Sequence, residues 1–494
     1  MARPLAARWS RRALVGAFSA LLALPGLAGT GAVASKGGAP ALADVNSNFE
    51  LVGHNPLGNR GMNAAIAVHG NYAYIGSRTD GKANNANHAG IMVVDISNPT
   101  TPTTVREIGP PLEANPGESS RELRIWKSQD ILIVLHTNCG EIHVCGGRPS
   151  VNFFRFYDIS GANASDPKKI VDLNMNTHEF FLWEDPFDPN FALMFGGSAG
   201  TSMQVWDISP VRDGQVPTTV FNSSSSYTGG LHSLSVSNDG TRAYFALLTG
   251  GFAVADVSDF THRVPSPAIR RVTLSNARPT WPGPGAHSAV KLWNQDYVYV
   301  ADEVYGEAAK ALGAHGCPWG WARMIDISDP TRPVVRAEYK LPQNEASFCT
   351  TDVPRPSSSY SAHNPTVTPH LVITSWHSGG VQVVDVSNPA APVKAGEFVP
   401  GLDQRPAAVV QEDPLLSAGQ DKVAMWSYPI IRDGLIYLTD IRNGLYILRY
   451  TGPHAAEVSE VDFLEGNSNL GDALLFEPVD PCSPLNPTPP DTCP

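Results

Sequence analysis

The amino-acid sequence predicts an all-β protein, a seven-bladed β-propeller built from four-stranded blades. Three observations lead to this prediction. The composition favours short strands joined by turns, one short phrase recurs six times along the chain, and the last blade lacks a strand that the start of the chain can supply. Together they indicate a closed ring, because closure leaves no open sheet seam.

The composition excludes several classes of protein. The 494 residues include 44 glycines and 42 prolines, against usual shares of about 7% and about 5%, and charged residues make up 17%, against about 25% in average proteins. Hydrophobic residues make up 42%, which excludes wholesale disorder, and the sparse charge excludes a coiled coil. The net charge is -12 and the basic residues cluster only at the N-terminus, so we expect no nucleic-acid partner.

Residues 1–34 predict a secretory signal peptide. They carry four arginines and no acidic residue: Arg3, Arg8, Arg11 and Arg12. An apolar run from Ala13 to Leu24 and small residues up to Ala34 follow, in the order of a cleavable signal. A membrane anchor is the weaker alternative, because the run is shorter than the roughly 20 residues that span a bilayer. Both a general signal and a twin-arginine signal fit Arg11 and Arg12. We therefore expect a secreted, extracellular protein with no membrane span in its mature chain.

One phrase organises the rest of the chain. It occurs most fully as Ile91–Pro99 (IMVVDISNP) and Val381–Pro389 (VQVVDVSNP). Four other copies end in Asp-Ile-Ser or Asp-Val-Ser, at Asp158, Asp207, Asp256 and Asp326. The copies are unevenly spaced, which indicates one structural unit with loops of different lengths. A seventh copy, Gly444–Arg449, has Arg449 where the aspartate is expected.

The fifth unit illustrates the four strands of a blade. We expect its strands at His287–Leu292, Tyr297–Asp302, Arg323–Asp326 and Pro333–Tyr339, because each run is rich in β-branched or aromatic residues and bounded by turn residues. The aspartate at the end of the third strand can accept backbone hydrogen bonds in an Asx turn. The proline suits an outer strand, where one missing ladder bond is tolerated.

The last unit is incomplete. Trp426–Tyr450 supplies three strands, and the segment Asn48–Gly53, ahead of the first inner strand, can supply the fourth. The propeller therefore spans residues 46–450. A Pro-rich extension, residues 451–494, follows it.

The recurring phrase closely resembles the LVIVD repeat, which builds seven-bladed propellers in bacterial surface and secreted proteins. The resemblance covers about residues 48–450. It implies the fold strongly and the function hardly at all, because propellers host many unrelated activities. The departures are Arg449 and the widened loops of the second and fifth blades.

Four histidines occupy equivalent places in the repeat. In a propeller, the starts of the innermost strands and the ends of the second strands lie on one face around the channel, here called the mouth. The seven predicted starts are Asn63, Arg121, His178, His232, His287, His363 and Trp426. The predicted ends of the second strands bring five more residues to the same face: Arg78, His136, Glu303, His377 and Asp440. The fold is therefore expected to gather imidazoles and carboxylates from distant positions.

This set has three interpretations. Imidazole suits copper, zinc, iron or nickel, so a candidate metal or ligand site consists of His178, His232, His287, His363, His136, Glu303 and His377. Equivalent histidines can instead belong to the repeat itself and hold neighbouring blades together. A small bound ligand is the third interpretation.

Two hypotheses about function follow. The leading one is a monomeric binding or interaction module whose mouth takes a small molecule or an extracellular protein. The alternative is an extracellular enzyme that depends on copper, zinc or iron, with an oxidoreductase as the favoured class. No catalytic residue is identified, and no Gly-x-Ser-x-Gly motif marks a nucleophile.

Six cysteines in an exported protein indicate three disulfides. The pairs we expect are Cys139 with Cys145, Cys317 with Cys349, and Cys482 with Cys493. The blade assignment supports the middle pair, because both of its cysteines lie in loops on the mouth. Spacing does not prove the connectivity. Zinc ligation is the competing interpretation, although the chain has no Cys-x-x-Cys pair.

Overall fold

The structure is a computed structural model. It describes residues 45–460 apart from 79–87, 89, 110–117, 139–151, 176, 198–202, 224–229, 284, 305–317, 351–358 and 413–416. The described residues belong to one compact unit, Ala41–Pro494. No helix among them is long and apolar enough to cross a membrane. The predicted signal peptide and residues 461–494 of the extension lie outside the described residues.

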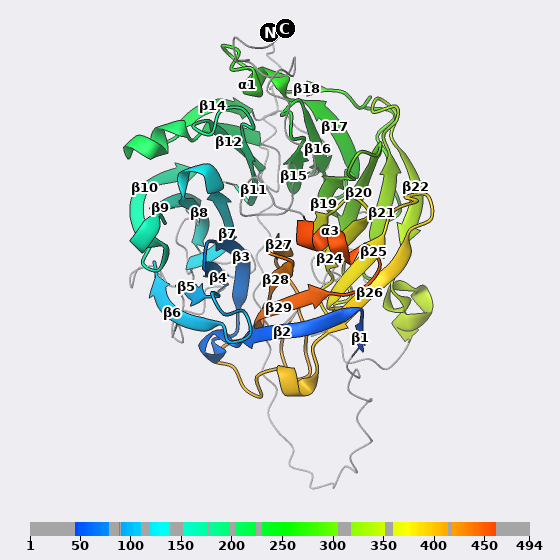
Figure 1. Ribbon diagram of the computed structural model, residues 1–494. Coiled ribbons are helices and arrows are strands. Elements are labelled where there is room, and N and C mark those ends of the chain that lie inside the picture. The colour runs from blue at the N-terminus through cyan, green and yellow to red at the C-terminus, as the bar shows by residue number, and fades with distance from the viewer. Residues whose placement is uncertain are drawn as a thin grey trace, which may run out of the picture. The chain divides into compact units, whose positions relative to one another are not determined.

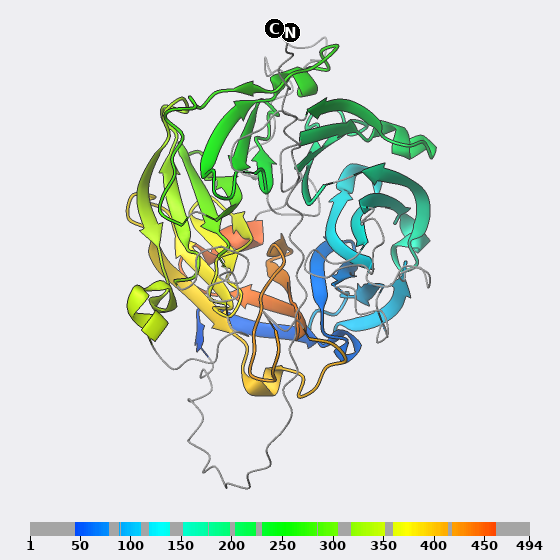
Figure 2. The ribbon, with the colours of Figure 1, turned by 180° about the vertical axis from the view of Figure 1, so that it is seen from behind.

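Seven antiparallel sheets form a ring, and each sheet is one blade (Figures 1 and 2). The first strand of each blade lies toward the centre, and the chain then steps outward strand by strand. The first four blades are: blade one, β3 (Asn63–His69), β4 (Tyr72–Ser77), β5 (Ile91–Asp95) and β6 (Thr103–Ile108); blade two, β7 (Glu118–Trp126), β8 (Ile131–Asn138), β9 (Asn152–Asp158) and β10 (Lys168–Met175); blade three, β11 (Glu179–Glu184), β12 (Ala192–Gly197), β13 (Met203–Asp207) and β14 (Thr218–Ser223); blade four, β15 (Ser233–Val236), β16 (Arg242–Ala246), β17 (Phe252–Asp256) and β18 (Arg270–Arg271). The predicted fold class is confirmed.

The remaining blades close the ring. They are: blade five, β19 (Ala286–Lys291), β20 (Tyr297–Asp302), β21 (Ala322–Asp326) and β22 (Val334–Tyr339); blade six, β23 (Pro365–Val367), β24 (Leu371–Ser375), β25 (Val381–Asp385) and β26 (Val393–Val399); blade seven, β27 (Ile430–Arg432), β28 (Leu435–Asp440) and β29 (Gly444–Tyr450). The N-terminal strand β2 (Phe49–Asn55) pairs with β29, as predicted. One strand was not predicted: β1 (Val45–Ser47) pairs with β26 and gives blade six a fifth strand.

Short helices occupy the connections. They are η1 (Leu57–Asn59), η3 (Lys127–Gln129), η4 (Gly161–Ala164), η5 (Ser209–Asp213), α1 (Ser258–Thr261), η6 (Pro342–Asn344), η7 (Ala346–Thr350), η8 (Leu402–Gln404) and α3 (Ala455–Glu460).

The recurring aspartate makes the same turn in six blades. Its Oδ1 atom accepts a hydrogen bond of 2.8–3.0 Å from the backbone N–H of the serine two residues later, in the pairs Asp95–Ser97, Asp158–Ser160, Asp207–Ser209, Asp256–Ser258, Asp326–Ser328 and Asp385–Ser387. This Asx turn ends the third strand and starts the connection to the fourth. The phrase recurs because each blade needs the same corner.

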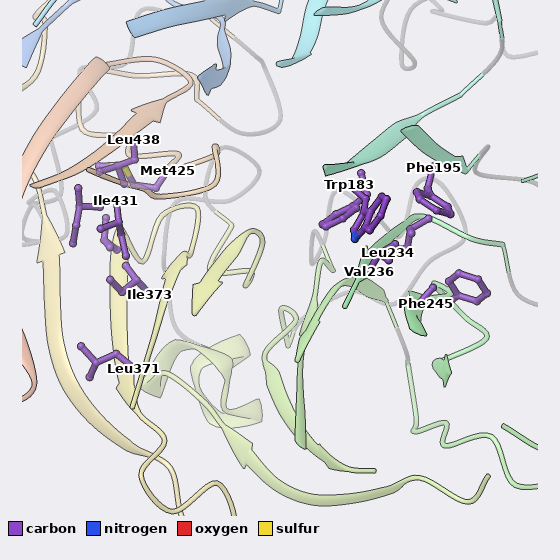
Figure 3. Close-up of a cluster of buried hydrophobic side chains, with 14 of the residues drawn as sticks. Trp183, Phe195, Leu234, Val236, Phe245, Leu371, Ile373, Met425, Ile431 and Leu438 are labelled. Carbon is purple, nitrogen blue, oxygen red and sulfur yellow. The ribbon is translucent and has the colours of Figure 1, made fainter. Parts of the chain in front are cut away.

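The hydrophobic core lies between the faces of neighbouring blades. Figure 3 shows two parts of its largest cluster. One part joins blades three and four through Trp183, Phe195, Leu234, Val236 and Phe245, and the other joins blades six and seven through Leu371, Ile373, Met425, Ile431 and Leu438. Each such side chain contributes about 1.5–3 kcal/mol on burial. Blade-to-blade packing thus fixes the strands that carry the mouth residues.

Candidate functional site

The histidines of the repeat occupy the same place in successive blades. In four blades the backbone N–H of this residue donates to a carbonyl of the second strand, at 2.9–3.0 Å: His178 to Gly197, His232 to Ala246, His363 to Ser375 and Trp426 to Thr439. His287 lies at the start of β19, where the register to β20 shifts between Ala286 and Ser288. The fold therefore turns a sequence repeat into a ring of equivalent positions.

The side chains at these positions form a continuous row. Neighbouring ring centroids are 4.4 Å apart for His178 and His232, 4.0 Å for His232 and His287, 4.3 Å for His287 and His363, and 4.1 Å for His363 and Trp426. His377, in the turn after β24, stacks on Trp426 and lies 4.9 Å from His363. We call His178, His232, His287, His363 and His377 the histidine row. It crosses blades three to six, whose first strands surround the centre in Figure 1.

An arginine lies at each end of this arrangement. Nη2 of Arg121 lies 3.1 Å from Nε2 of His178, and the Arg78 guanidinium lies 4.4 Å from the Trp426 ring centroid. The exposed fraction falls along the row, from 8% at His178 and 6% at His232 to 0% at the other three histidines. The row therefore opens toward solvent at the His178 end.

Glu303 is the carboxylate that faces three of these imidazoles. It directly follows β20, and its Oε1 atom lies 3.3 Å from Nε2 of His363 and 3.2 Å from Nε2 of His377. Its Oε2 atom lies 3.4 Å from Nε2 of His287. Glu303 thus places a carboxylate among the histidines at the end of the second strand of blade five.

Glu179 is a second carboxylate, which the sequence did not single out. Its Oε1 atom lies 3.4 Å from Nε2 of His287, and its Oε2 atom lies 3.7 Å from Nδ1 of His232. Three overlapping groups offer ligand atoms that all lie within 4.8 Å of one another: His178–Glu179–His232, His232–His287–Glu303 and Glu303–His363–His377. Nitrogen and carboxylate donors at such spacing are the ligands of transition metals.

Hydrogen bonds fix which nitrogen of two buried histidines carries the proton. Nδ1 of His363 lies 2.6 Å from the carbonyl oxygen of Trp426, so this nitrogen must donate. Nδ1 of His287 lies 2.8 Å from the hydroxyl oxygen of Ser288, whose own proton goes to Oδ1 of Asn364. In the neutral rings, both Nε2 atoms therefore carry a lone pair, and neither makes a hydrogen bond within the part of the chain that the structure describes.

The same logic applies at the open end of the row. Arginine can only donate, so Nε2 of His178 accepts from Arg121. Nε2 of His178 also lies 2.8 Å from Nε2 of His232, and His232 must be the donor of this pair. Nδ1 of a neutral His232 then presents its lone pair on the side of Glu179.

Electrostatics set the protonation of these buried groups when no cation is bound. Burial lowers the pKa of His287 well below its usual value and that of His363 to about 3. Burial alone would raise the pKa of Glu303, but the surrounding imidazoles, His363 first, hold it well below its usual range. Burial and the nearby Glu122 raise the pKa of Glu179 well above its usual value. At neutral pH His287 and His363 are therefore neutral and Glu303 is ionised, whereas Glu179 holds its proton until a cation displaces it.

A buried charged pair lies beside Glu179. Nη1 of Arg124 lies 3.0 Å from Oε2 of Glu122, and its guanidinium lies over the rings of Phe180 and Tyr428. Both charged side chains are about 1% exposed. Glu122 and Arg124 follow Arg121 in β7, the first strand of blade two. This position next to a predicted mouth residue is the sequence signal that could have identified them.

Not every predicted residue joins the row. His136 is buried in β8, where its ring stacks on Phe153 at 4.7 Å, and it belongs to none of the three groups. Asp440 accepts backbone hydrogen bonds from Ala424, Arg442 and Asn443, so it orders a loop. The backbone of Cys349 lies in η7, whereas its side chain and the other five cysteines lie outside the described residues. The disulfide pairs stay predictions.

A fourth group lies at the surface and was not predicted. It combines His370, before β24, with His454 and Glu457, at the start of α3. Nδ1 of His370 contacts Oε1 of Glu457, and the two imidazoles stack at 4.7 Å. Oε2 of Glu457 accepts hydrogen bonds from Thr368 and from the backbone of His370. These contacts tie α3 to blade six.

The comparisons with known proteins support the repeat. Residues 60–108 and 376–399 match the LVIVD repeat. The first match spans blade one, and the second covers the third and fourth strands of blade six. Two blades are thus similar to LVIVD repeats. No curated protein matches the chain.

Two solved structures are similar to this chain at low sequence identity. Two crystal structures of Sqt1 from Chaetomium thermophilum each match with 16% identity and a TM-score of 0.44. The matches cover 81% and 80% of this chain and 86% of each Sqt1 chain.

Proposed function

We propose that this propeller is a binding module that takes up a transition-metal ion at its mouth, through His363, His377 and Glu303. The observation that carries the proposal is the contact between His363 and Glu303. Nδ1 of His363 donates to the carbonyl of Trp426, and Nε2 then faces Oε1 of Glu303 at 3.3 Å. Two electron-pair donors at this separation repel each other unless a proton or a metal ion lies between them, and burial, which lowers the pKa of His363 to about 3, disfavours a proton on this imidazole.

His377 completes the ligand set. Its Nε2 atom lies 3.2 Å from the same Glu303 oxygen, and its Nδ1 atom lies 3.2 Å from the hydroxyl of Ser359. A hydrogen bond at the far nitrogen is the usual way in which a protein orients a metal-binding histidine. Two imidazoles and one carboxylate match copper, zinc and iron better than they match calcium or magnesium, which prefer oxygen ligands.

The turn that holds His377 supports a role beyond architecture. His377 has φ 36 and a bridge to Met425, and the equivalent residue of blade four, Leu248, has φ 44 and a bridge to Ala286. The turn therefore accepts leucine, and the imidazole is not needed to form it. Because the backbone geometry does not require an imidazole at position 377, the presence of histidine there supports a binding role.

The site of action is also part of this proposal. The arginine-rich start and apolar run of residues 1–34 support export, so metal uptake would take place outside the cytoplasm.

Zinc titration of the mature chain, purified without a histidine tag, tests the proposal. We expect saturable binding in isothermal titration calorimetry, and at least a 100-fold loss of affinity in His363→Ala and in His377→Leu, which takes the residue of blade four. His136→Ala is the matched control, because His136 is buried and stacks on Phe153 but belongs to none of the three groups. Equal affinity in the parent and both variants, or no binding by folded parent protein, would contradict the proposal.

A further inference from the structure

We infer that the histidine row holds two transition-metal ions, bridged by the carboxylate of Glu303. This inference rests on the proposed function, which itself requires only the ion at His363 and His377. The observation that indicates a bridge is that the two carboxylate oxygens of Glu303 face different imidazoles.

The two oxygens of Glu303 face different histidines. Oε1 faces His363 and His377 at 3.3 and 3.2 Å, whereas Oε2 faces His287 at 3.4 Å. The groups His232–His287–Glu303 and Glu303–His363–His377 share Glu303 alone. A carboxylate placed in this way offers one oxygen to each of two ions.

The second ligand set has its own carboxylate. Nε2 of His287 lies 3.4 Å from Oε1 of Glu179 as well as from Oε2 of Glu303. Its Nδ1 proton is directed to Ser288, so a lone pair faces both carboxylates. Oε2 of Glu179 makes no hydrogen bond among the described residues, although Glu179 is 3% exposed. A buried set of this kind is costly unless a cation satisfies it.

His232 completes the second set. Its Nε2 atom donates to His178, and its Nδ1 atom lies 3.7 Å from Oε2 of Glu179. The second ion would thus be held by His232, His287, Glu179 and Oε2 of Glu303. It would lie nearer than the first ion to the end of the row where His178 and His232 are partly exposed.

Copper(II) loading of the mature, untagged chain tests this inference. After removal of excess metal, we expect two copper ions per chain by elemental analysis and an electron paramagnetic resonance spectrum of a coupled pair, with a half-field signal. Glu179→Gln should lower the content to one ion and abolish the coupling. Glu184→Gln, at the other end of β11 and equally buried, is the matched control and should keep both ions. Circular dichroism melting shows whether each variant is folded, and His287→Asn is the second variant if Glu179→Gln is not.

Each outcome decides between the two claims. One ion in the parent, lost in His363→Ala, would overturn the second ion and leave the proposed function intact. Two ions without coupling would overturn the bridge, and two coupled ions retained in folded Glu179→Gln and His287→Asn would overturn the assigned ligands. A folded parent chain that binds no copper or zinc would overturn both the inference and the proposed function.

Discussion

Phe49 and Tyr450 meet edge to face, with ring centroids 5.4 Å apart, as register partners on the paired strands β2 and β29, which come from opposite ends of the propeller sequence. Phe49 also contacts Phe398 of blade six at 6.2 Å. The side chain of Asn48 donates to the carbonyl of Ala395 in the same blade. The N-terminal segment therefore fastens blade seven to blade six.

The first prediction concerns this closure. Deleting residues 46–55 removes β2 and exposes the edge of β29, so we expect lower thermal stability and aggregation. Phe49→Ala is the milder test and should cost about 3–5 kcal/mol of unfolding free energy in chemical denaturation. Val45→Ala, at a residue that is 38% exposed, is the control and should change it by less than about 0.5 kcal/mol. A deletion variant that melts like the parent would show that β2 does not close the ring.

The second prediction concerns Glu184. Burial raises the pKa of this carboxyl to about 8, while the backbone N–H of Lys127 and the hydroxyl of Ser128 donate to it. A raised pKa means that the folded state binds the proton more tightly, so stability is full below pH 4.5 and is lost as the pH rises toward 8. The loss can reach about 1.4 kcal/mol per pH unit.

Glu184→Gln should remove this dependence. We expect the unfolding free energy of this variant minus that of the parent, both measured by urea denaturation between pH 5 and 8.5, to increase as the pH rises. The exposed Glu345→Gln serves as the control and should follow the parent. Parallel profiles for Glu184→Gln and the parent would show that Glu184 is already ionised in the folded state.

The third prediction concerns the cysteines. We expect a disulfide between Cys317 and Cys349, which mass mapping of the non-reduced protein would detect as one linked peptide. A bridge of this loop length stabilises by roughly 3–4 kcal/mol in the chain-entropy model. Both positions belong to connections of blades five and six, which carry Glu303 and His363. Replacing both cysteines with serine should therefore weaken metal binding more than it destabilises the blades, and a peptide that links Cys317 to another cysteine would refute the pairing.

The sequence was sufficient to predict the fold because the repeat carries local turn chemistry. Asp95 and its equivalents specify the same Asx turn, so six corners are visible without any tertiary information. The extra strand β1 was not predicted because its three residues are exposed and show no apolar alternation. β1 directly precedes β2 in the sequence, so its pairing with β26 depends on how β2 is placed when it closes blade seven beside blade six.

The candidate site was only partly predictable. The histidines were found because they recur at one position of the repeat. Glu179 directly follows His178, and because neighbouring residues of a strand point to opposite faces, strand alternation would not place both at the mouth. β11 begins at Glu179, however, so His178 lies before the alternation starts. The proton positions on His287 and His363 depend on Asn364 and the Trp426 carbonyl, contacts that only the folded chain brings together.

Anomalous diffraction from crystals of the zinc-loaded chain is the most direct test of metal binding at the mouth. Data collected on both sides of the zinc absorption edge should show a peak bounded by Glu303, His363 and His377, and a second peak next to Glu179 and His287 if two ions bind. Zinc found only at the surface group of His370, His454 and Glu457, or no peak at Glu303 in crystals soaked to saturation, would contradict the account.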